Sequence, residues 1–213
     1  MTQVTLSTRD ICQLAPVIPV LVVDNINDAQ PLARALVKGG LPVLEITLRT
    51  AAALDVIRAM SEVEGGVVGA GTLLTPQDVK AAKAAGARFG VSPGVTPDLL
   101  KAAQDEGLAL LPGAATASEV MYLLALGYET LKFFPAEAAG GIPMLKSWFG
   151  SLPAVSFCPT GGITLASAAH YLALPNVLCV GGSWLAPKDL MTRQDWAGIE
   201  ALARQAAALA THS

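Results

Sequence analysis

Short apolar runs recur through the sequence, and longer segments that mix Ala and Leu with charged residues separate them. The short runs are typical of buried strands, and the longer segments are typical of amphipathic helices. Several of the longer segments open with a capping threonine followed by a proline, as in Thr75-Pro76 and Thr96-Pro97, and helices commonly begin in this way. The expected strands are residues 17–23, 43–49, 67–72, 88–93, 108–114, 130–135, 155–161 and 177–183.

Eight expected strands, each followed by a helical segment, predict one α/β domain spanning residues 1–213. The regular alternation favours a closed (β/α)8 TIM barrel with short loops. The segment before Ala15 is expected to add an N-terminal helix that closes the bottom of the barrel. A solenoid of the same period is the alternative, but the units share no repeat consensus.

Lys132 is a lone cation within the apolar run 130–135, and Glu45 is the one acid in the middle of another expected strand. Charges in buried strands carry a large desolvation cost, so they are usually paired or catalytic. Strand alternation places Glu45 and Arg49 on one face, and Lys132 and Phe134 on one face of the sixth strand. If the apolar faces pack on helices, Lys132 and Glu45 converge in the barrel mouth. The structural alternative, an ion pair that only fixes register, is weak because such pairs often add no stability.

Glycine pairs end the last two strands, in Pro159-Thr160-Gly161-Gly162 and Val180-Gly181-Gly182-Ser183. Consecutive glycines let backbone N–H groups approach an anion, and these two strand ends are the usual phosphate position in a barrel. Thr72 ends the third strand, where its hydroxyl and the Arg49 guanidinium could hold a carboxylate.

These groups together suggest a reaction. A lysine amine attacks a ketone to form a Schiff base, which withdraws electrons and stabilises a neighbouring carbanion. With a carboxylate site nearby and a phosphate site further away, this chemistry fits carbon–carbon cleavage next to a 2-keto acid. Glu45 is then placed to move protons during the reaction.

Composition narrows the alternatives. The net charge of −3 and the absence of a basic cluster argue against nucleic acid, and no apolar run is long enough to span a bilayer. The first residues show no export signal, so a cytoplasmic protein is expected.

Cys12, Cys158 and Cys179 form no CxxC pair and suit neither a disulfide framework nor zinc. The two histidines, His170 and His212, suit neither a catalytic triad nor a His-based metal site, and residues 69–72 are not a dinucleotide fingerprint, so a metal hydrolase, a serine hydrolase and a dehydrogenase all lose support and no cofactor is expected.

Several sequence motifs resemble those of one known protein family. The chain resembles the 2-keto-3-deoxy-6-phosphogluconate (KDPG) aldolase family from about Val17 to Leu185. The resemblance rests on the segments 44–50, 69–72, 132–137, 157–162 and 181–184. It implies a metal-free class I aldolase of the Entner–Doudoroff pathway, assembled as a homotrimer. The implied substrate is 2-dehydro-3-deoxy-6-phosphogluconate, and the implied products are pyruvate and D-glyceraldehyde 3-phosphate.

The resemblance also implies residue roles. Lys132 would form the Schiff base, and Glu45 would accept and donate protons. Arg49 and Thr72 would bind the pyruvyl carboxylate, Pro93 would line the pocket, and Phe134 would influence stereochemical preference. The phosphate would be surrounded by Thr160, Gly161, Gly162, Gly182 and Ser183.

Two alternatives remain open. A sister aldolase would act on the galacto epimer or on 4-hydroxy-2-oxoglutarate, and it would share the Lys132–Glu45 pair. A non-catalytic phosphosugar-binding barrel would keep the pocket without the chemistry, and the intact pair counts against it.

Overall fold

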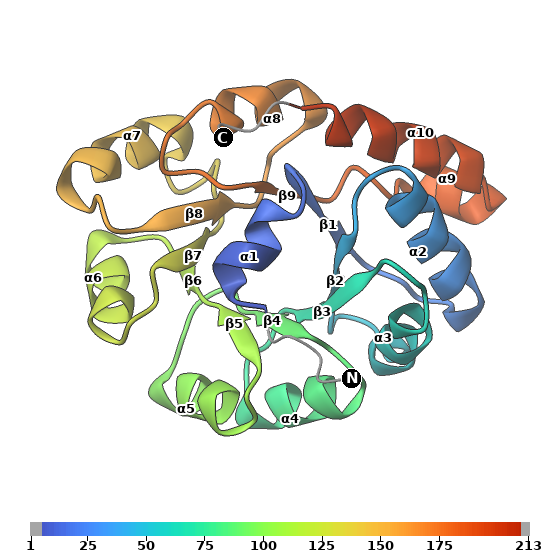
Figure 1. The fold of residues 1–213 in the computed structure, drawn as a ribbon, viewed down its shortest axis with the longest axis horizontal. Coiled ribbons are helices and arrows are strands. Elements are labelled where there is room, and N and C mark those ends of the chain that lie inside the picture. The colour runs from blue at the N-terminus through green and yellow to red at the C-terminus, as the bar shows by residue number, and fades with distance from the viewer. Residues whose placement is uncertain (1–5, 210–213) are drawn as a thin grey trace.

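The computed structural model describes residues 6–209, which form a curled parallel sheet with helices around its outside (Figure 1). His212 lies outside the described residues. The strands are β1 (Val17–Leu21), β2 (Val43–Thr47), β3 (Val67–Gly71), β4 (Phe89–Val91), β5 (Ala109–Leu111), β6 (Gly113–Ala114), β7 (Thr130–Phe133), β8 (Ser156–Pro159) and β9 (Val180–Gly182). Each lies within a range that the sequence predicts.

Helices connect the strands and cover the outer face of the sheet (Figure 1). They are α1 (Thr8–Gln13), the short 3₁₀ helix η1 (Ile26–Asp28), α2 (Ala29–Lys38), α3 (Ala53–Ser61), α4 (Pro76–Ala84), α5 (Pro97–Asp105), α6 (Ala117–Ala125), α7 (Gly141–Ser151), α8 (Leu165–Leu172), α9 (Lys188–Arg193) and α10 (Trp196–Ala207). Thr75 and Thr96 cap α4 and α5 as expected, because each side-chain oxygen accepts a backbone N–H of the first turn.

The strands pair in parallel in two groups. Six strands follow the order β5-β4-β3-β2-β1-β9, and three follow the order β6-β7-β8. The predicted strand at 108–114 is divided at Pro112, which has no N–H to donate to a neighbouring strand. Single bridges, Phe157 with Val177 and Thr160 with Gly181, link the β8 and β9 segments.

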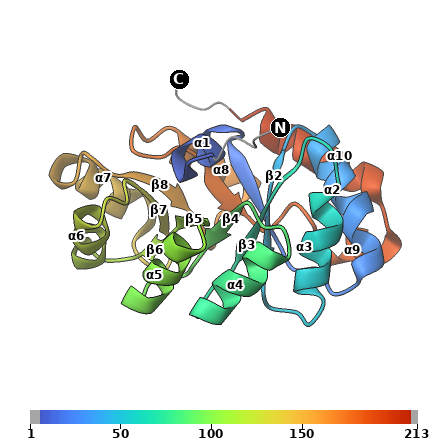
Figure 2. The same cartoon turned by 60° about the horizontal axis from the view of Figure 1, so that its bottom comes forward.

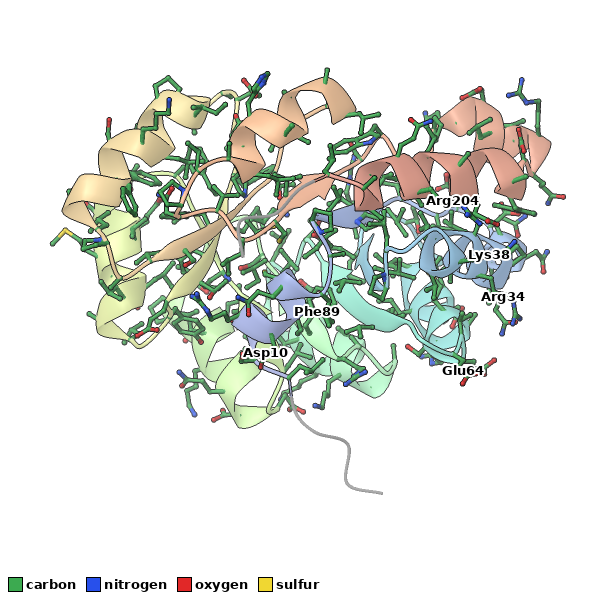
Figure 3. All side chains as sticks on the ribbon, turned by 45° about the horizontal axis from the view of Figure 1, so that its top comes forward. Asp10, Arg34, Lys38, Glu64, Phe89 and Arg204 are labelled. Carbon is green, nitrogen blue, oxygen red and sulfur yellow. The ribbon has the colours of Figure 1, made fainter. Side chains whose placement is uncertain are left out.

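The expected N-terminal helix is present as α1, which lies over the centre of the sheet and at one end of the strands (Figures 1 and 2). Its buried Ile11 and Cys12 pack with Val43, Val67 and Phe89. These three residues begin β2, β3 and β4, so α1 closes the amino ends of the strands. Figure 3 shows Phe89 close to this helix. The opposite, carboxyl ends of the strands remain open for the polar residues predicted to form the site.

Strand alternation divides the buried side chains into two layers. Leu44, Ile46, Val68 and Ala70 belong to the large cluster that the helices cover, whereas Val43 and Val67 belong to the inner cluster. Glu45 lies two residues beyond Val43 and therefore shares its inward side. No helix of residues 6–209 is long and apolar enough to cross a membrane.

Candidate active site

Lys132 and Glu45 meet inside the sheet, as strand alternation predicts. Lys132 comes from β7 and Glu45 from β2, 87 positions apart in the sequence, and Lys132 Nζ donates to Glu45 Oε1 at 3.3 Å. Both residues are buried, with exposed fractions of 6% for Lys132 and 3% for Glu45. The sheet therefore holds an amine and a carboxylate in direct contact and largely out of water.

Room for the Glu45 carboxylate comes from Gly71 at the end of β3. A Cβ atom on Gly71 would overlap Glu45 Oε1, so any larger residue would displace the carboxylate. Sequence reasoning gave Gly71 no role of its own. The available signal was that Gly69 and Gly71 share the inward parity of β3, where side chains would otherwise fill the interior.

Burial and charge act in opposite directions on Glu45. Desolvation raises the pKa of its carboxyl above the ordinary value, and the nearby Lys132 charge opposes this rise only in part. The Lys132 ammonium also lies 5.1 Å from the centroid of the Phe134 ring, within the range of a cation–π contact. Phe134 is thus beside the amine, and its influence on stereochemical preference stays a prediction.

Arg49 and Thr72 follow neighbouring strands, β2 and β3, but no hydrogen bond joins their side chains within residues 6–209. Leu48 N–H donates to Gly71 O at 2.9 Å, which ties the two strand ends together just before these residues. Arg49 is exposed and Thr72 is half-buried. Thr72 has a φ of 61°, an unfavourable left-handed conformation for a β-branched residue. Such strain often marks a functional position.

Pro93 lies beside Gly113, the first residue of β6. A Cβ atom on Gly113 would overlap the Pro93 carbonyl group, and Gly113 is the register partner of Lys132. Pro93 therefore lies beside β6, the strand that pairs with β7 of Lys132, and its place in the pocket wall stays a prediction.

The predicted phosphate residues gather at the adjacent ends of β8 and β9. Thr160 bridges to Gly181, and a Cβ atom there would overlap Thr160 Oγ1. Gly161 lies close to Phe134, since its Cβ would be 3.4 Å from Phe134 Cδ2. Ser183 lines a cavity of about 550 Å³ beside the carboxyl ends of β1 and β9, together with Asp24, Asp28 and Lys188. Gly182, between Gly181 and Ser183, packs against the Trp184 ring.

The structure also shows where the three cysteines lie and how the potential metal ligands are arranged. Cys12, Cys158 and Cys179 are free and buried in the inner cluster, as small apolar side chains would be. Among residues 6–209, no group of three or more His, Cys, Asp and Glu side chains is arranged to hold a metal ion.

Comparisons with known proteins decide the family. The model of the KDPG and KHG aldolase family matches residues 8–202. The chain belongs to this family. It is therefore an aldolase, a carbon–carbon lyase, and the non-catalytic alternative is set aside.

Individual relatives agree with this assignment. The 2-dehydro-3-deoxy-phosphogluconate aldolase of Zymomonas mobilis is 54% identical over 198 residues, 93% of this chain and 94% of the relative. A crystal structure of the Zymomonas mobilis ZM4 aldolase with 3-phosphoglycerate has a TM-score of 0.92 and 53% identity, and the match covers 96% of this chain and 97% of that one.

A second solved structure concerns a covalent intermediate. The KDPG aldolase of Legionella pneumophila, with pyruvate captured at low pH as a covalent carbinolamine, has a TM-score of 0.92 and 46% identity. The match covers 95% of this chain and 99% of that chain.

The Gly71 contact leads to a testable prediction. Gly71→Ala is expected to displace the Glu45 carboxylate and lower kcat on the order of 10- to 100-fold, because small misplacements of catalytic groups are costly. Steady-state kinetics measures this effect, and circular dichroism checks the fold. Gly150→Ala is the control, since a Cβ there meets nothing within 4 Å. Equal kcat values for the two variants would contradict the role of Gly71.

Proposed function

We propose that this chain cleaves 2-dehydro-3-deoxy-6-phosphogluconate to pyruvate and D-glyceraldehyde 3-phosphate through a Schiff base on Lys132. The observation that carries the proposal is the buried contact of Lys132 Nζ with Glu45 Oε1. The names of the similar proteins from Zymomonas mobilis and Legionella pneumophila support the substrate.

The chemistry begins at the Lys132 amine. The neutral amine adds to the C2 ketone to give a carbinolamine, which loses water to form a protonated imine. Deprotonation of the C4 hydroxyl then allows the C3–C4 bond to break, which releases the aldehyde and leaves an enamine. Protonation of the enamine at C3 and hydrolysis of the imine release pyruvate and restore the amine. We assign these proton transfers to Glu45, directly or through one water molecule, because its carboxylate already touches the amine.

Recognition of the two ends of the substrate is assigned to the strand ends. Arg49 and Thr72 bind the carboxylate, Pro93 lines the pocket, and Phe134 contacts the reacting centre beside Lys132. The phosphate is bound by Thr160, Gly161, Gly162, Gly182 and Ser183. The complex of the Zymomonas mobilis relative with 3-phosphoglycerate, a phosphorylated three-carbon acid, is consistent with a phosphate site in this fold.

We extend the proposal to the barrel fold, the oligomeric state and the cellular location of the protein. The bridges between the β8 and β9 segments, together with the separation of β5 from β6 by the single residue Pro112, support a closed (β/α)8 barrel. By family resemblance we also propose a cytoplasmic homotrimer that acts in the Entner–Doudoroff pathway without a cofactor.

Substrate choice can be tested by turnover. We expect kcat/KM for 2-dehydro-3-deoxy-6-phosphogluconate to exceed the values for its galacto epimer, for 4-hydroxy-2-oxoglutarate and for the unphosphorylated acid, each by about tenfold or more. Pyruvate release, coupled to NADH oxidation by lactate dehydrogenase, measures all four substrates. Lys132→Met, which has no amine, is the blank. Equal values for the four substrates would reject the proposed substrate preference.

The raised pKa of Glu45 predicts a pH dependence. A base must be ionised to accept a proton, so activity should rise with pH through this raised pKa. The acid limb of kcat/KM should therefore lie above about pH 4.3, the ordinary glutamate value. Glu45→Gln should lose this limb and reduce kcat by roughly 10²- to 10⁴-fold. Glu64→Gln, at an exposed position, is the control. An unchanged limb in Glu45→Gln would assign the titration to another group.

A further inference from the structure

Glu137 and Tyr171 form a contact that the proposed reaction does not use. Glu137 lies in the connection between β7 and α7, and Tyr171 belongs to α8. Tyr171 Oη donates a hydrogen bond to Glu137 Oε1 at 2.8 Å. Tyr171 is buried, with an exposed fraction of 1%. Burial, together with the Glu137 carboxylate, raises the pKa of Tyr171, so the hydroxyl remains a donor.

The same glutamate also contacts the turn that follows β8. Ala136 N–H donates to Thr160 O at 2.8 Å, and Glu137 N–H donates to Gly161 O at 3.1 Å. The backbone of the β7–α7 connection is therefore hydrogen-bonded to two residues that we assign to phosphate binding.

The Glu137 side chain packs directly against the next glycine. A Cβ atom on Gly162 would be 2.6 Å from Glu137 Cγ, and Gly162 has a φ of 81°, so no other residue fits there without strain. Glu137 thus holds Gly161 through its backbone and Gly162 through its side chain, while Tyr171 holds the carboxylate at the far end.

The direction of the carboxylate matters because a phosphate is an anion. A free Glu137 carboxylate next to Gly162 would repel a phosphate bound at the same turn. The hydrogen bond from Tyr171 fixes this carboxylate toward α8 and shares its charge with a donor. Loss of the hydroxyl would free the carboxylate and loosen the Glu137 side chain against Gly162, while the backbone hydrogen bonds to the turn would remain.

We propose that Glu137 and Tyr171 are positioning residues that hold the Thr160–Gly162 turn in the shape that binds the phosphate end of the substrate. The inference rests on the proposed function, because that function places the phosphate at this turn. The pair acts on affinity for the phosphate end, whereas Lys132 and Glu45 carry out the bond cleavage.

Variants of Glu137 and Tyr171 should raise KM for the phosphorylated substrate and leave kcat nearly unchanged. Tyr171→Phe and Glu137→Ala are each expected to raise KM for the phosphorylated substrate roughly three- to tenfold, the scale of one lost hydrogen bond. Neither should change kcat by more than about twofold, since the Lys132 site is untouched. KM for the unphosphorylated acid should stay at the wild-type value. Glu137→Gln keeps an acceptor for Tyr171 Oη and should retain a nearly normal KM.

Double and control variants sharpen the test. Tyr171→Phe combined with Glu137→Ala should raise KM no more than the worse single variant, because both changes remove the same contact. Tyr122→Phe and Glu64→Ala, at exposed positions, are the matched controls and should leave KM unchanged. An unchanged KM in Tyr171→Phe and Glu137→Ala, or an equal rise for both substrates, would overturn the proposal.

A measurement with inorganic phosphate separates this proposal from the proposed function. Phosphate should raise the Tm of the wild-type protein, and a several-fold higher phosphate concentration should be needed in Tyr171→Phe for the same rise. If the wild type fails to cleave the phosphorylated acid, the proposed function is wrong, and a weakened phosphate effect in the variant still supports the pair. If cleavage is normal and the phosphate effect is equal in both proteins, the role of the pair is wrong.

Discussion

The contact between the Lys132 amine and the Glu45 carboxylate is the constraint on which the rest of the interior depends. Two charges held 3.3 Å apart and out of water require a rigid frame, because loss of either partner leaves an uncompensated buried charge. The frame is provided by β2 and β7. Gly71 leaves the space that the carboxylate occupies, and α1 closes the opposite end of the strands with apolar side chains. A purely structural ion pair often adds no stability over apolar residues of similar volume, whereas the proposed reaction requires an amine and a carboxylate in contact.

Around this centre, chemistry and recognition are supplied by different parts of the chain. The groups to which we assign the reaction lie on strands within the sheet, and the residues assigned to the substrate's carboxylate and phosphate lie at or near the strand ends. The turn at Gly161 and Gly162 has no side chains with which to hold its own shape. Its support comes from Glu137 in the preceding connection and from Tyr171 in the following helix. The proposed reaction centre is therefore held by the sheet itself, and the proposed phosphate turn is held by residues of the neighbouring segments.

Alternation along single strands was enough to predict the meeting of Lys132 with Glu45, because a strand fixes the side of each residue and a parallel sheet fixes which ends meet. The strand order of the expected barrel placed the glycine turns after β8 and β9 side by side. The break at Pro112 and the contact of Gly71 with Glu45 were not predicted, since both depend on how neighbouring strands align. The Glu137–Tyr171 bond joins residues 34 positions apart through a connection and a helix, and no periodic pattern in either segment indicates it.

The central claim is that Lys132 is the amine that binds pyruvate covalently, and borohydride trapping tests it most directly. Borohydride reduces a protonated imine to a stable secondary amine, so incubation with pyruvate and borohydride fixes any Schiff base at its lysine. Peptide mass analysis of the digested protein then locates the adduct. We expect one pyruvyl adduct, on Lys132 alone, and none in Lys132→Met. A folded protein with no adduct, or with its adduct on another lysine, would contradict it.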